Sequence, residues 1–348
     1  MLRARRTGVT RGGHDAGVAR SRRHPGFARA ASPPPSLANV SVPPPLIVAV
    51  ALFVLVAWAG ALAVLMRRQA RVIFGSPRAL RSAPAGAHAV HGAQPVTLDV
   101  ADDVRLQGWL TTSPQPPSGL VVWLGGRNED VGWTPAIASW LGPDWAVCAF
   151  NYRGCAGSTG RPGEADSVRD ALAIAAWAVA RTGVPHDHVI LIGRSLGSAV
   201  AVQAAARRPV AGLVLLSPPA SVRRIMRRNP LLWPALPWLR HPFDSLAAAA
   251  RVRCPSLVLL AERYRRVPHG ESLALARALR DAAAVAPALE HQVRTLPGTT
   301  HRTLARSAGS LAAMAAFAHG LAVEWRDERR GTDSPARHHG VLVAGAHP

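Results

Sequence analysis

The sequence contains no lysine, so its formal net charge of +21 rests on arginine alone. A basic balance of this size can indicate nucleic acid or anionic lipid as a partner, because arginine pairs well with phosphate. The arginines are scattered, however, and no stacking aromatic side chains accompany their densest groups, as a single-stranded nucleic-acid site requires. The composition therefore predicts that nucleic acid is not a partner.

Cysteine is also scarce. Cys148, Cys155 and Cys254 form an odd, unclustered set without the spacing of metal ligands. We expect three reduced and mostly buried thiols. The set agrees with a reducing compartment and predicts no metal site.

Hydrophobic residues are abundant, at 49% of the 348 residues, which is ample for a large buried core. The pattern along the chain divides it into five segments. We expect a disordered basic tail at 1–45, a transmembrane helix at 46–66, a linker at 67–95, a globular domain at 96–325 and a second disordered tail at 326–348.

Residues 46–66 form an uninterrupted apolar run of the length needed to cross a bilayer core of about 30 Å. A cleaved signal peptide is the alternative, but the run is long for one and has no small-x-small site before Arg67. Several arginines follow the run, namely Arg67, Arg68, Arg71, Arg78 and Arg81, whereas Arg29 is the only close one before it. The positive-inside rule then predicts a single-pass membrane protein whose globular domain lies in the cytoplasm.

From residue 96 onward, short apolar runs alternate with helical patterns. The expected strands are 96–100, 104–111, 119–124, 146–150, 189–192, 213–216, 256–260 and 292–296, and the expected helices are 135–141, 165–181, 196–206, 271–281 and 302–323. Continuous apolar runs are typical of parallel strands that are covered on both faces. The alternation predicts an α/β fold with a doubly wound, mostly parallel sheet. Residues 221–243 break it and look like a lid insertion over one end of the sheet.

The most informative string is HVILIGRSLGSAVAVQAAARRP, which reads as strand, tight turn and helix. Gly193 and Gly197 flank Ser195 as G-x-S-x-G, because a serine on so sharp a turn clashes with neighbours that carry a Cβ. The helix that follows adds backbone donors, and the N–H of Leu196 is placed to bind a developing oxyanion. The motif by itself is weak, but the strand before it and the helix after it are the context that a nucleophilic serine requires.

A nucleophilic serine needs a base, and that base is expected after the last strand. His301 lies there, in LPGTTHRTL. A second oxyanion donor is expected from the turn after an early strand, and GLVVWLGGRNED supplies one, with the N–H of Gly126 or Arg127 as the donor. A glycine turn without a ligand is the alternative interpretation of that string.

With these strings in place, residues 71–323 resemble the α/β-hydrolase superfamily, close to its membrane-anchored, lysophospholipase-like and serine peptidase-like branch. Besides the turn at Ser195, which we call the elbow, the resemblance rests on the opening hairpin DDVRLQGWL, the loop FNYRGCAGSTGRPGE and the strand RCPSLVLL. It implies a hydrolase domain at 96–325 with a lid at 221–243. It also implies hydrolysis of a small-molecule or lipid-like acyl substrate through an acyl-enzyme, without a cofactor or metal.

One residue departs from the pattern of such hydrolases. The penultimate strand is normally followed by an aspartate that orients the histidine, whereas alignment on Val267 and Pro268 puts Tyr264 at that position. Losing the acid in a serine protease lowers turnover by about four orders of magnitude, or about 5 kcal/mol of barrier. Glu262, two residues earlier, is the nearest substitute; Glu129 and Asp130 are remoter ones.

Two functions therefore stay open at the level of the sequence. The first is a membrane-anchored serine hydrolase that cleaves an ester, thioester or amide, with Ser195 as nucleophile and His301 as base. The second is a hydrolase-fold scaffold or binding protein whose catalysis is impaired, which Tyr264 supports. The substrate and the oligomeric state are not encoded in any pattern that we find.

Overall fold

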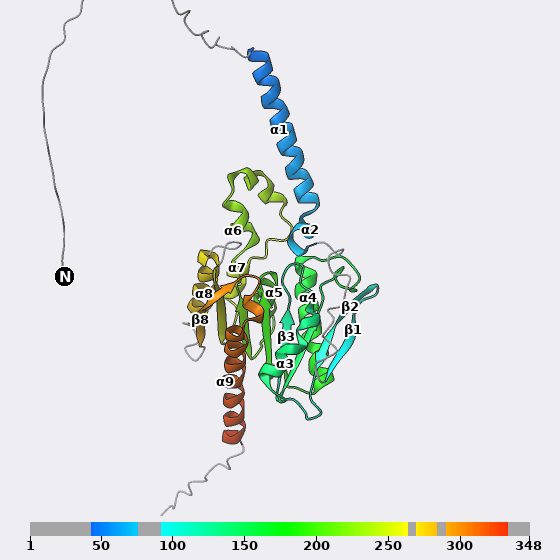
Figure 1. The fold of residues 1–348 in the computed structure, drawn as a ribbon, viewed down its shortest axis with the longest axis vertical. Helices are drawn as coiled ribbons and strands as arrows, with labels where there is room; N and C mark the ends of the chain where they lie inside the picture. Colours follow the sequence, from blue (N-terminus) through cyan, green and yellow to red (C-terminus); the bar gives the residue numbers. More distant parts are fainter. Residues whose placement is uncertain (1–42, 76–91, 264–268, 284–289, 333–348) are drawn as a thin grey trace, which may run out of the picture. The chain divides into compact units, whose positions relative to one another are not determined.

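A computed structural model describes residues 43–75, 92–263, 269–283 and 290–332 (Figure 1). The chain divides into two compact units, Met1–Val54 and Leu55–Pro348. The expected tail residues 1–42 and 333–348 lie outside the described ranges. α1 (Pro44–Arg67) starts two residues before the predicted apolar run and ends one residue after it. In the described part of the chain, α1 is the one helix long and apolar enough to cross a membrane.

The second unit alternates strands with helices. Its strands are β1 (Ala93–Ala101), β2 (Val104–Thr111), β3 (Gly119–Leu124), β4 (Trp145–Phe150), β5 (Val189–Arg194), β6 (Gly212–Leu216), β7 (Ser256–Arg263) and β8 (His291–Thr300). Its helices after α1 are α2 (Gln69–Phe74), η3 (Val131–Trp133), α3 (Pro135–Leu141), α4 (Glu164–Thr182), η4 (His186–His188), α5 (Leu196–Ala205), α6 (Val222–Arg227), η5 (Pro230–Trp238), α7 (Ser245–Ala249), α8 (His269–Ala283), η6 (Leu304–Arg306) and α9 (Ala308–Thr332).

The described strands form one sheet in the order β1-β2-β4-β3-β5-β6-β7-β8. β1 pairs antiparallel with β2, and β2 with β4; from β4 onward every pair is parallel. The chain passes from β3 to β4 on one side and then returns to β5 on the other, so the connections reverse direction at β3. In sheets of this kind, ligands bind at such a switch point, beyond the carboxyl ends of the strands.

Helices cover both faces of the sheet, and alternate side chains of each strand feed two cores. In β3, Leu120 and Val122 belong to the core cluster to which α4, α5, α7 and α8 also contribute, whereas Val121 and Trp123 belong to the cluster of α3 and α9. All four side chains are fully buried. This confirms the predicted fold class, because a strand that is buried on both faces needs the continuous apolar run seen in its sequence.

The structure differs from the sequence-based expectation mainly outside the sheet. Residues 69–74 of the expected linker form α2, and β1 begins at Ala93, before the expected end of that linker. α9 continues to Thr332, past the expected domain end at 325. A six-residue helix such as α2 is too short to show an apolar period, so no pattern in the sequence predicts it.

α2 belongs to the core of the hydrolase-like unit rather than to a connector. The Phe74 side chain at its end is 1% exposed. Its ring packs edge-on against Tyr152, His241 and Phe243, with ring centroids 5.7 to 6.0 Å apart. Burial lowers the pKa of His241, and the positive charge of Arg240 lowers it further, so this cluster holds a neutral imidazole.

Replacing Phe74 with alanine is expected to lower the free energy of unfolding by about 3–5 kcal/mol, because the substitution leaves a cavity among rigid rings. Val72 on the same helix is 47% exposed, so Val72→Ala is the matched control, with an expected change within about 0.5 kcal/mol. Thermal unfolding of the full chain in detergent measures both variants. Equal midpoints for the two variants would contradict a core role for α2.

Candidate active site

Ser195 stands between β5 and α5 in a strained backbone conformation. Its φ is 50° and its ψ is −111°, a backbone conformation that residues other than glycine rarely adopt. The Ser195 N–H donates to the carbonyl of Leu216 in β6 at 2.8 Å, so the neighbouring strand holds the turn in place. Strain of this kind clusters at functional sites, where the surrounding structure maintains it.

Crowding around the turn explains the two glycines of the motif. A Cβ on Gly193 would overlap the carbonyl oxygen of Gly197, and a Cβ on Gly197 would overlap the carbonyl oxygen of Leu124. Only glycine fits at either position. The second contact places the start of α5 directly against the end of β3, where the loop with the predicted oxyanion donors begins.

This oxyanion loop, residues 125–130, contains a buried carboxylate. The Glu129 side chain is 5% exposed, and it accepts hydrogen bonds from Gly126 N–H at 2.6 Å and from Trp133 Nε1 at 3.0 Å. It also pairs with Arg194 at 2.8 Å. The N–H of Gly126, one of the predicted oxyanion donors, is therefore engaged within the loop.

Two other predicted donors have no such engagement. Within the described ranges, the backbone N–H of Arg127 makes no hydrogen bond. Leu196 is the first residue of α5, and the N–H groups of a first helical turn have no partner within the helix. The N–H groups of Leu196 and Arg127 therefore stay the predicted oxyanion donors.

Arg194, the residue before Ser195, joins three segments that are far apart in the sequence. Its Nη1 lies 2.8 Å from the Glu129 carboxylate, and its Nη2 donates to the His301 carbonyl oxygen at 3.2 Å. These partners are 65 and 107 positions away. Arg194 therefore holds the oxyanion loop and the histidine loop, residues 296–304 around His301, against the turn at Ser195.

The oxyanion loop is supported from two further directions. The Tyr152 hydroxyl donates to the Gly125 carbonyl oxygen at 2.9 Å. Burial raises the pKa of Tyr152, and the nearby Glu129 carboxylate raises it further, so this hydroxyl stays a neutral donor. From the side of α2, the Phe74 carbonyl oxygen accepts from the Asn128 N–H at 3.2 Å. The loop is consequently built into the fold at both ends.

His301 follows β8, and its Nδ1 atom is buried. Glu262, near the end of β7, accepts a hydrogen bond from the Gly298 N–H at 2.8 Å. Among the described residues, the Glu262 carboxylate therefore contacts the backbone of the strand that leads to His301. Tyr264, at the position expected for the acid, lies outside the described residues.

The structure thus gathers most of the predicted site residues at the carboxyl edge of the sheet. Ser195 and Leu196 follow β5, Gly126 and Arg127 follow β3, and Arg194 ties His301 to both. Sequence reasoning missed Arg194, which occupies the first variable position of the serine motif. Nothing in the local sequence indicates which carboxylate an arginine pairs with. In the described ranges, no group of three or more histidine, cysteine or acidic side chains could hold a metal ion.

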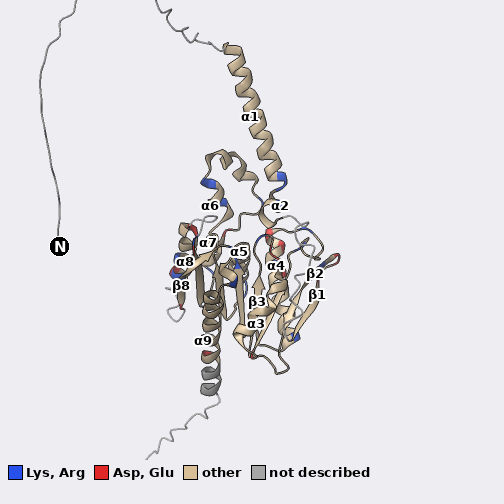
Figure 2. Ribbon diagram, in the orientation of Figure 1, with Lys and Arg blue, Asp and Glu red and all other residues tan. Residues whose placement is uncertain are grey.

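Residues 221–243, which the sequence predicts to be a lid and for which we keep that name, contain α6 and η5 and are basic at one end and apolar at the other. Figure 2 shows cationic residues on α6 and at the end of α1. η5 contains no charged residue, and three of its large side chains, Leu231, Trp233 and Trp238, are 56–65% exposed. Exposed apolar surface beside a cationic surface is typical of elements that contact membranes.

Comparison with known proteins identifies the family. Residues 115–248 match the family described as Serine aminopeptidase, S33. An uncharacterized protein of Mycobacterium tuberculosis is 33% identical over 215 residues, which cover 60% of this chain and 74% of that protein. The chain belongs to the α/β-hydrolase superfamily.

Two further comparisons agree with this assignment. The lysophosphatidylserine lipase ABHD12 of Xenopus tropicalis is 31% identical over 161 residues, or 39% of this chain and 41% of that protein. A crystal structure of an alpha-beta hydrolase from Vibrio vulnificus superposes with a TM-score of 0.55 at 20% identity, over 73% of this chain and 93% of that one. The chain thus spans less than half of the length of the lipase, and the likeness to the crystal structure concerns the fold.

Proposed function

We propose that this protein is a serine hydrolase that cleaves an ester, thioester or amide bond of a lipid-like acyl substrate. The observation that carries the proposal is the strained Ser195, held at a strand-to-helix turn with the oxyanion loop and the histidine loop bonded to the residue before it. Family membership supports hydrolysis, and the lipase among the relatives favours a lipid-like substrate.

In the proposed mechanism, the Ser195 hydroxyl attacks the acyl carbonyl while His301 accepts its proton. The oxyanion that forms binds to the N–H groups of Leu196 and Arg127, because the Gly126 N–H is engaged by Glu129. His301 then gives the proton to the leaving group, which departs and leaves an acyl-enzyme. Water attacks this intermediate with His301 as base, and Ser195 is regenerated.

We propose that Glu262 supports His301 through the backbone of Gly298 rather than as a direct partner of the imidazole. By holding the end of β8 in place, this hydrogen bond fixes the position of the histidine that follows the strand.

We further propose that α1 anchors the chain in a membrane as a single pass, with the hydrolase domain on the cytoplasmic side. The helix has 24 residues, which at 1.5 Å per residue span about 36 Å and exceed a bilayer core of about 30 Å. Arg67, Arg68 and Arg71, all exposed, follow its end and support this orientation.

A second candidate function is a scaffold or binding protein of the same fold with impaired catalysis. The engaged Gly126 N–H is the observation that favours it, because one of the expected oxyanion donors is occupied. Retention of the strained serine and of Arg127 and Leu196 favours the enzyme instead. The two functions differ in whether Ser195 reacts with an electrophile.

A fluorophosphonate probe on the purified full chain tests the proposal. We expect covalent labelling that is complete within hours and that Ser195→Ala abolishes, because the strained turn exposes the hydroxyl to its base and to the oxyanion donors. Ser198→Ala is the matched control, since that hydroxyl is buried and donates to the Gly193 carbonyl oxygen at 2.7 Å. Labelling of Ser195→Ala at the wild-type level, or no labelling of the wild type, would favour the scaffold.

A further inference from the structure

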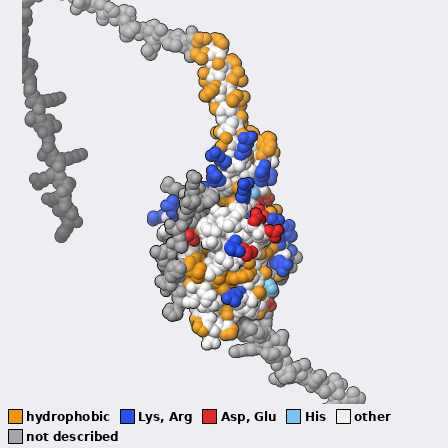
Figure 3. Space-filling model, turned by 90° about the vertical axis from the view of Figure 1, so that its right-hand side faces the viewer, with side chains coloured by type: hydrophobic (Ala, Val, Ile, Leu, Met, Phe, Trp, Pro, Cys, Tyr) orange, Lys and Arg blue, Asp and Glu red, His pale blue; other side chains and the backbone are white. Residues whose placement is uncertain are grey.

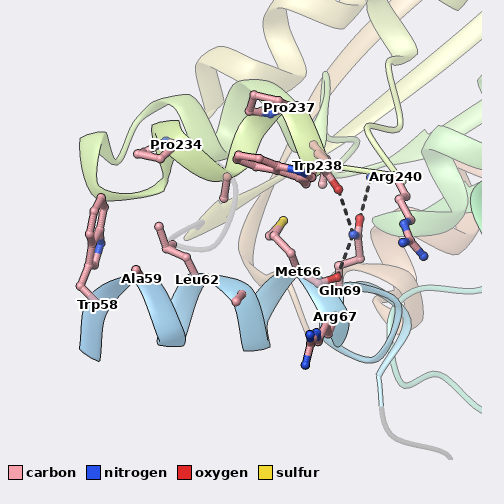
Figure 4. A pocket seen from close by; sticks show the side chains of 13 residues that line it. Trp58, Ala59, Leu62, Met66, Arg67, Gln69, Pro234, Pro237, Trp238 and Arg240 are labelled. Carbon is pink, nitrogen blue, oxygen red and sulfur yellow. Dashed lines mark hydrogen bonds between the residues drawn. The ribbon is translucent and has the colours of Figure 1, made fainter. Parts of the chain in front are cut away.

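An apolar groove lies between the C-terminal half of α1 and the lid (Figure 4). Its volume is about 690 Å³, within the range of small-molecule and lipid sites. The apolar side chains that line it include Trp58, Ala59, Leu62, Met66, Pro234 and Trp238. None of the lining residues comes from the elbow, the oxyanion loop or the histidine loop, so the groove is distinct from the candidate active site.

A buried glutamine connects the two walls of the groove by hydrogen bonds. Gln69 is 5% exposed; its Nε2 donates to the carbonyl oxygens of Met66 and Trp238 at 2.9 and 3.1 Å, and its Oε1 accepts from the Arg240 N–H at 2.7 Å. These bonds tie the end of the lid to the junction of α1 and α2. Leu62 and Met66 pack against a small core of the lid, so the two walls of the groove are held together.

The groove runs along the helix axis from an apolar end to a cationic end. Figure 4 shows Trp58 near Pro234 at one end, and Arg67 and Arg240 near Gln69 at the other. Arg67 lies nine positions after Trp58, which is a rise of about 13.5 Å along the helix. This length is close to the hydrocarbon depth of one leaflet, about 15 Å, when Arg67 lies at the membrane surface.

The charge at the cationic end suits an anionic head group. The lining contains Arg67 and Arg240 and no acidic side chain among the described residues. Figure 3 shows further arginine side chains gathered where the apolar surface of α1 ends. Guanidinium groups bind phosphate through parallel hydrogen bonds, whereas a zwitterionic head group carries a compensating positive charge.

The apolar end of the groove suits an acyl chain because both of its walls carry apolar side chains. Leu231 and Trp233 on η5 are exposed beside a helix that has the composition of a membrane span, so both groove walls share the bilayer environment. The Trp58 indole N–H has no acceptor among the described residues. A lipid can therefore enter the groove from the bilayer without crossing water.

We propose that this groove binds one anionic phospholipid of the bilayer, with an acyl chain along Ala59, Leu62 and Met66 and its phosphate at Arg67 and Arg240. The inference rests on the proposed membrane anchoring and not on the proposed catalysis. The bound lipid completes the wall between α1 and η5, so it holds the lid beside the helix.

Native mass spectrometry of the full chain, released from nanodiscs that hold equal phosphatidylglycerol and phosphatidylcholine, tests the proposal. We expect one retained phosphatidylglycerol per chain, preferred over phosphatidylcholine by about tenfold. Ala59→Phe with Ala63→Phe fills the groove, so we expect it to lower retention at least about tenfold. Ala61→Phe makes the same change at an exposed position of α1 outside the lining and should retain lipid as the wild type does.

A second variant leaves the packing intact. Arg67→Gln with Arg240→Gln is expected to abolish the preference for phosphatidylglycerol, whereas Arg68→Gln should keep it. Thermal unfolding of each variant in detergent reports that it is folded whether or not Ser195 reacts. Fluorophosphonate labelling of Ser195 in the same samples tests the proposed catalysis separately from lipid retention. Equal retention of both lipids by the wild type, unchanged retention when the groove is filled, or a dimer that Ala59→Phe dissociates would each overturn the lipid assignment.

Discussion

Replacing His301 with alanine is expected to lower turnover of an activated ester by about four to six orders of magnitude, as removal of the base does in serine proteases. The physical reason is that the Ser195 hydroxyl loses the group that accepts its proton. Steady-state hydrolysis by the full chain in detergent measures the effect. His319→Ala is a suitable control, because that residue is exposed and its imidazole contacts the Leu141 carbonyl oxygen, remote from the elbow in the fold.

The same assay defines the role of Glu262. We expect Glu262→Gln to keep turnover within about tenfold of the wild type, because the glutamine oxygen can still accept from the Gly298 N–H. A loss of about four orders of magnitude would instead make Glu262 the orienting acid. Turnover of His301→Ala equal to that of the wild type would contradict His301 as the base.

Replacing Glu129 with glutamine is expected to lower kcat by about 10²–10³-fold and the free energy of unfolding by about 3–5 kcal/mol. The loss of kcat follows because both Glu129 oxygens accept hydrogen bonds, from the Gly126 N–H and from Trp133 Nε1, and glutamine has only one accepting oxygen. One of these two bonds is lost, so the oxyanion loop shifts, and a displaced oxyanion donor costs this much. The loss of stability follows because Arg194 would keep a largely buried charge without its partner.

Two further variants test this prediction, one as a matched control and one that removes both charges. Asp130→Asn is the matched control, since among the described residues this neighbouring carboxylate accepts only from the Gly132 N–H, and its loss should leave kcat within a few-fold. Glu129→Gln with Arg194→Met removes both charges, so it should recover stability relative to Glu129→Gln alone but not kcat. A rise in KM with unchanged kcat in Glu129→Gln would contradict the positioning of an oxyanion donor.

The sheet could be predicted from the sequence because its central strands, such as β3, β4 and β6, are buried on both faces. Such strands need apolar residues at every position, and the runs at 119–124 and 256–260 correspond to β3 and to most of β7. The serine turn could be predicted for a similarly local reason: each glycine of the motif meets a backbone oxygen that a Cβ would overlap. These requirements act within a few residues, so they leave a pattern.

The lid and the juxtamembrane segment could not be predicted to the same degree. η5 has two internal prolines and a 3₁₀ conformation, which have no apolar period to detect. In the sequence, Gln69 is an ordinary polar residue after an apolar run. Only the structure shows that it is buried and hydrogen-bonded to the backbone of Trp238 and Arg240. Polar side chains carry no local mark of the backbone groups that they will meet.

The sequence by itself determined the fold class, the strained position of Ser195 and the apolar span of α1, because each depends on residue type at short spacing. Only the tertiary structure decided what surrounds the serine. It paired Glu129 with Arg194, engaged the Gly126 N–H and joined α2 to both the oxyanion loop and the lid. These contacts connect residues 54 or more positions apart or depend on how a loop closes on itself, and no short-range pattern specifies them.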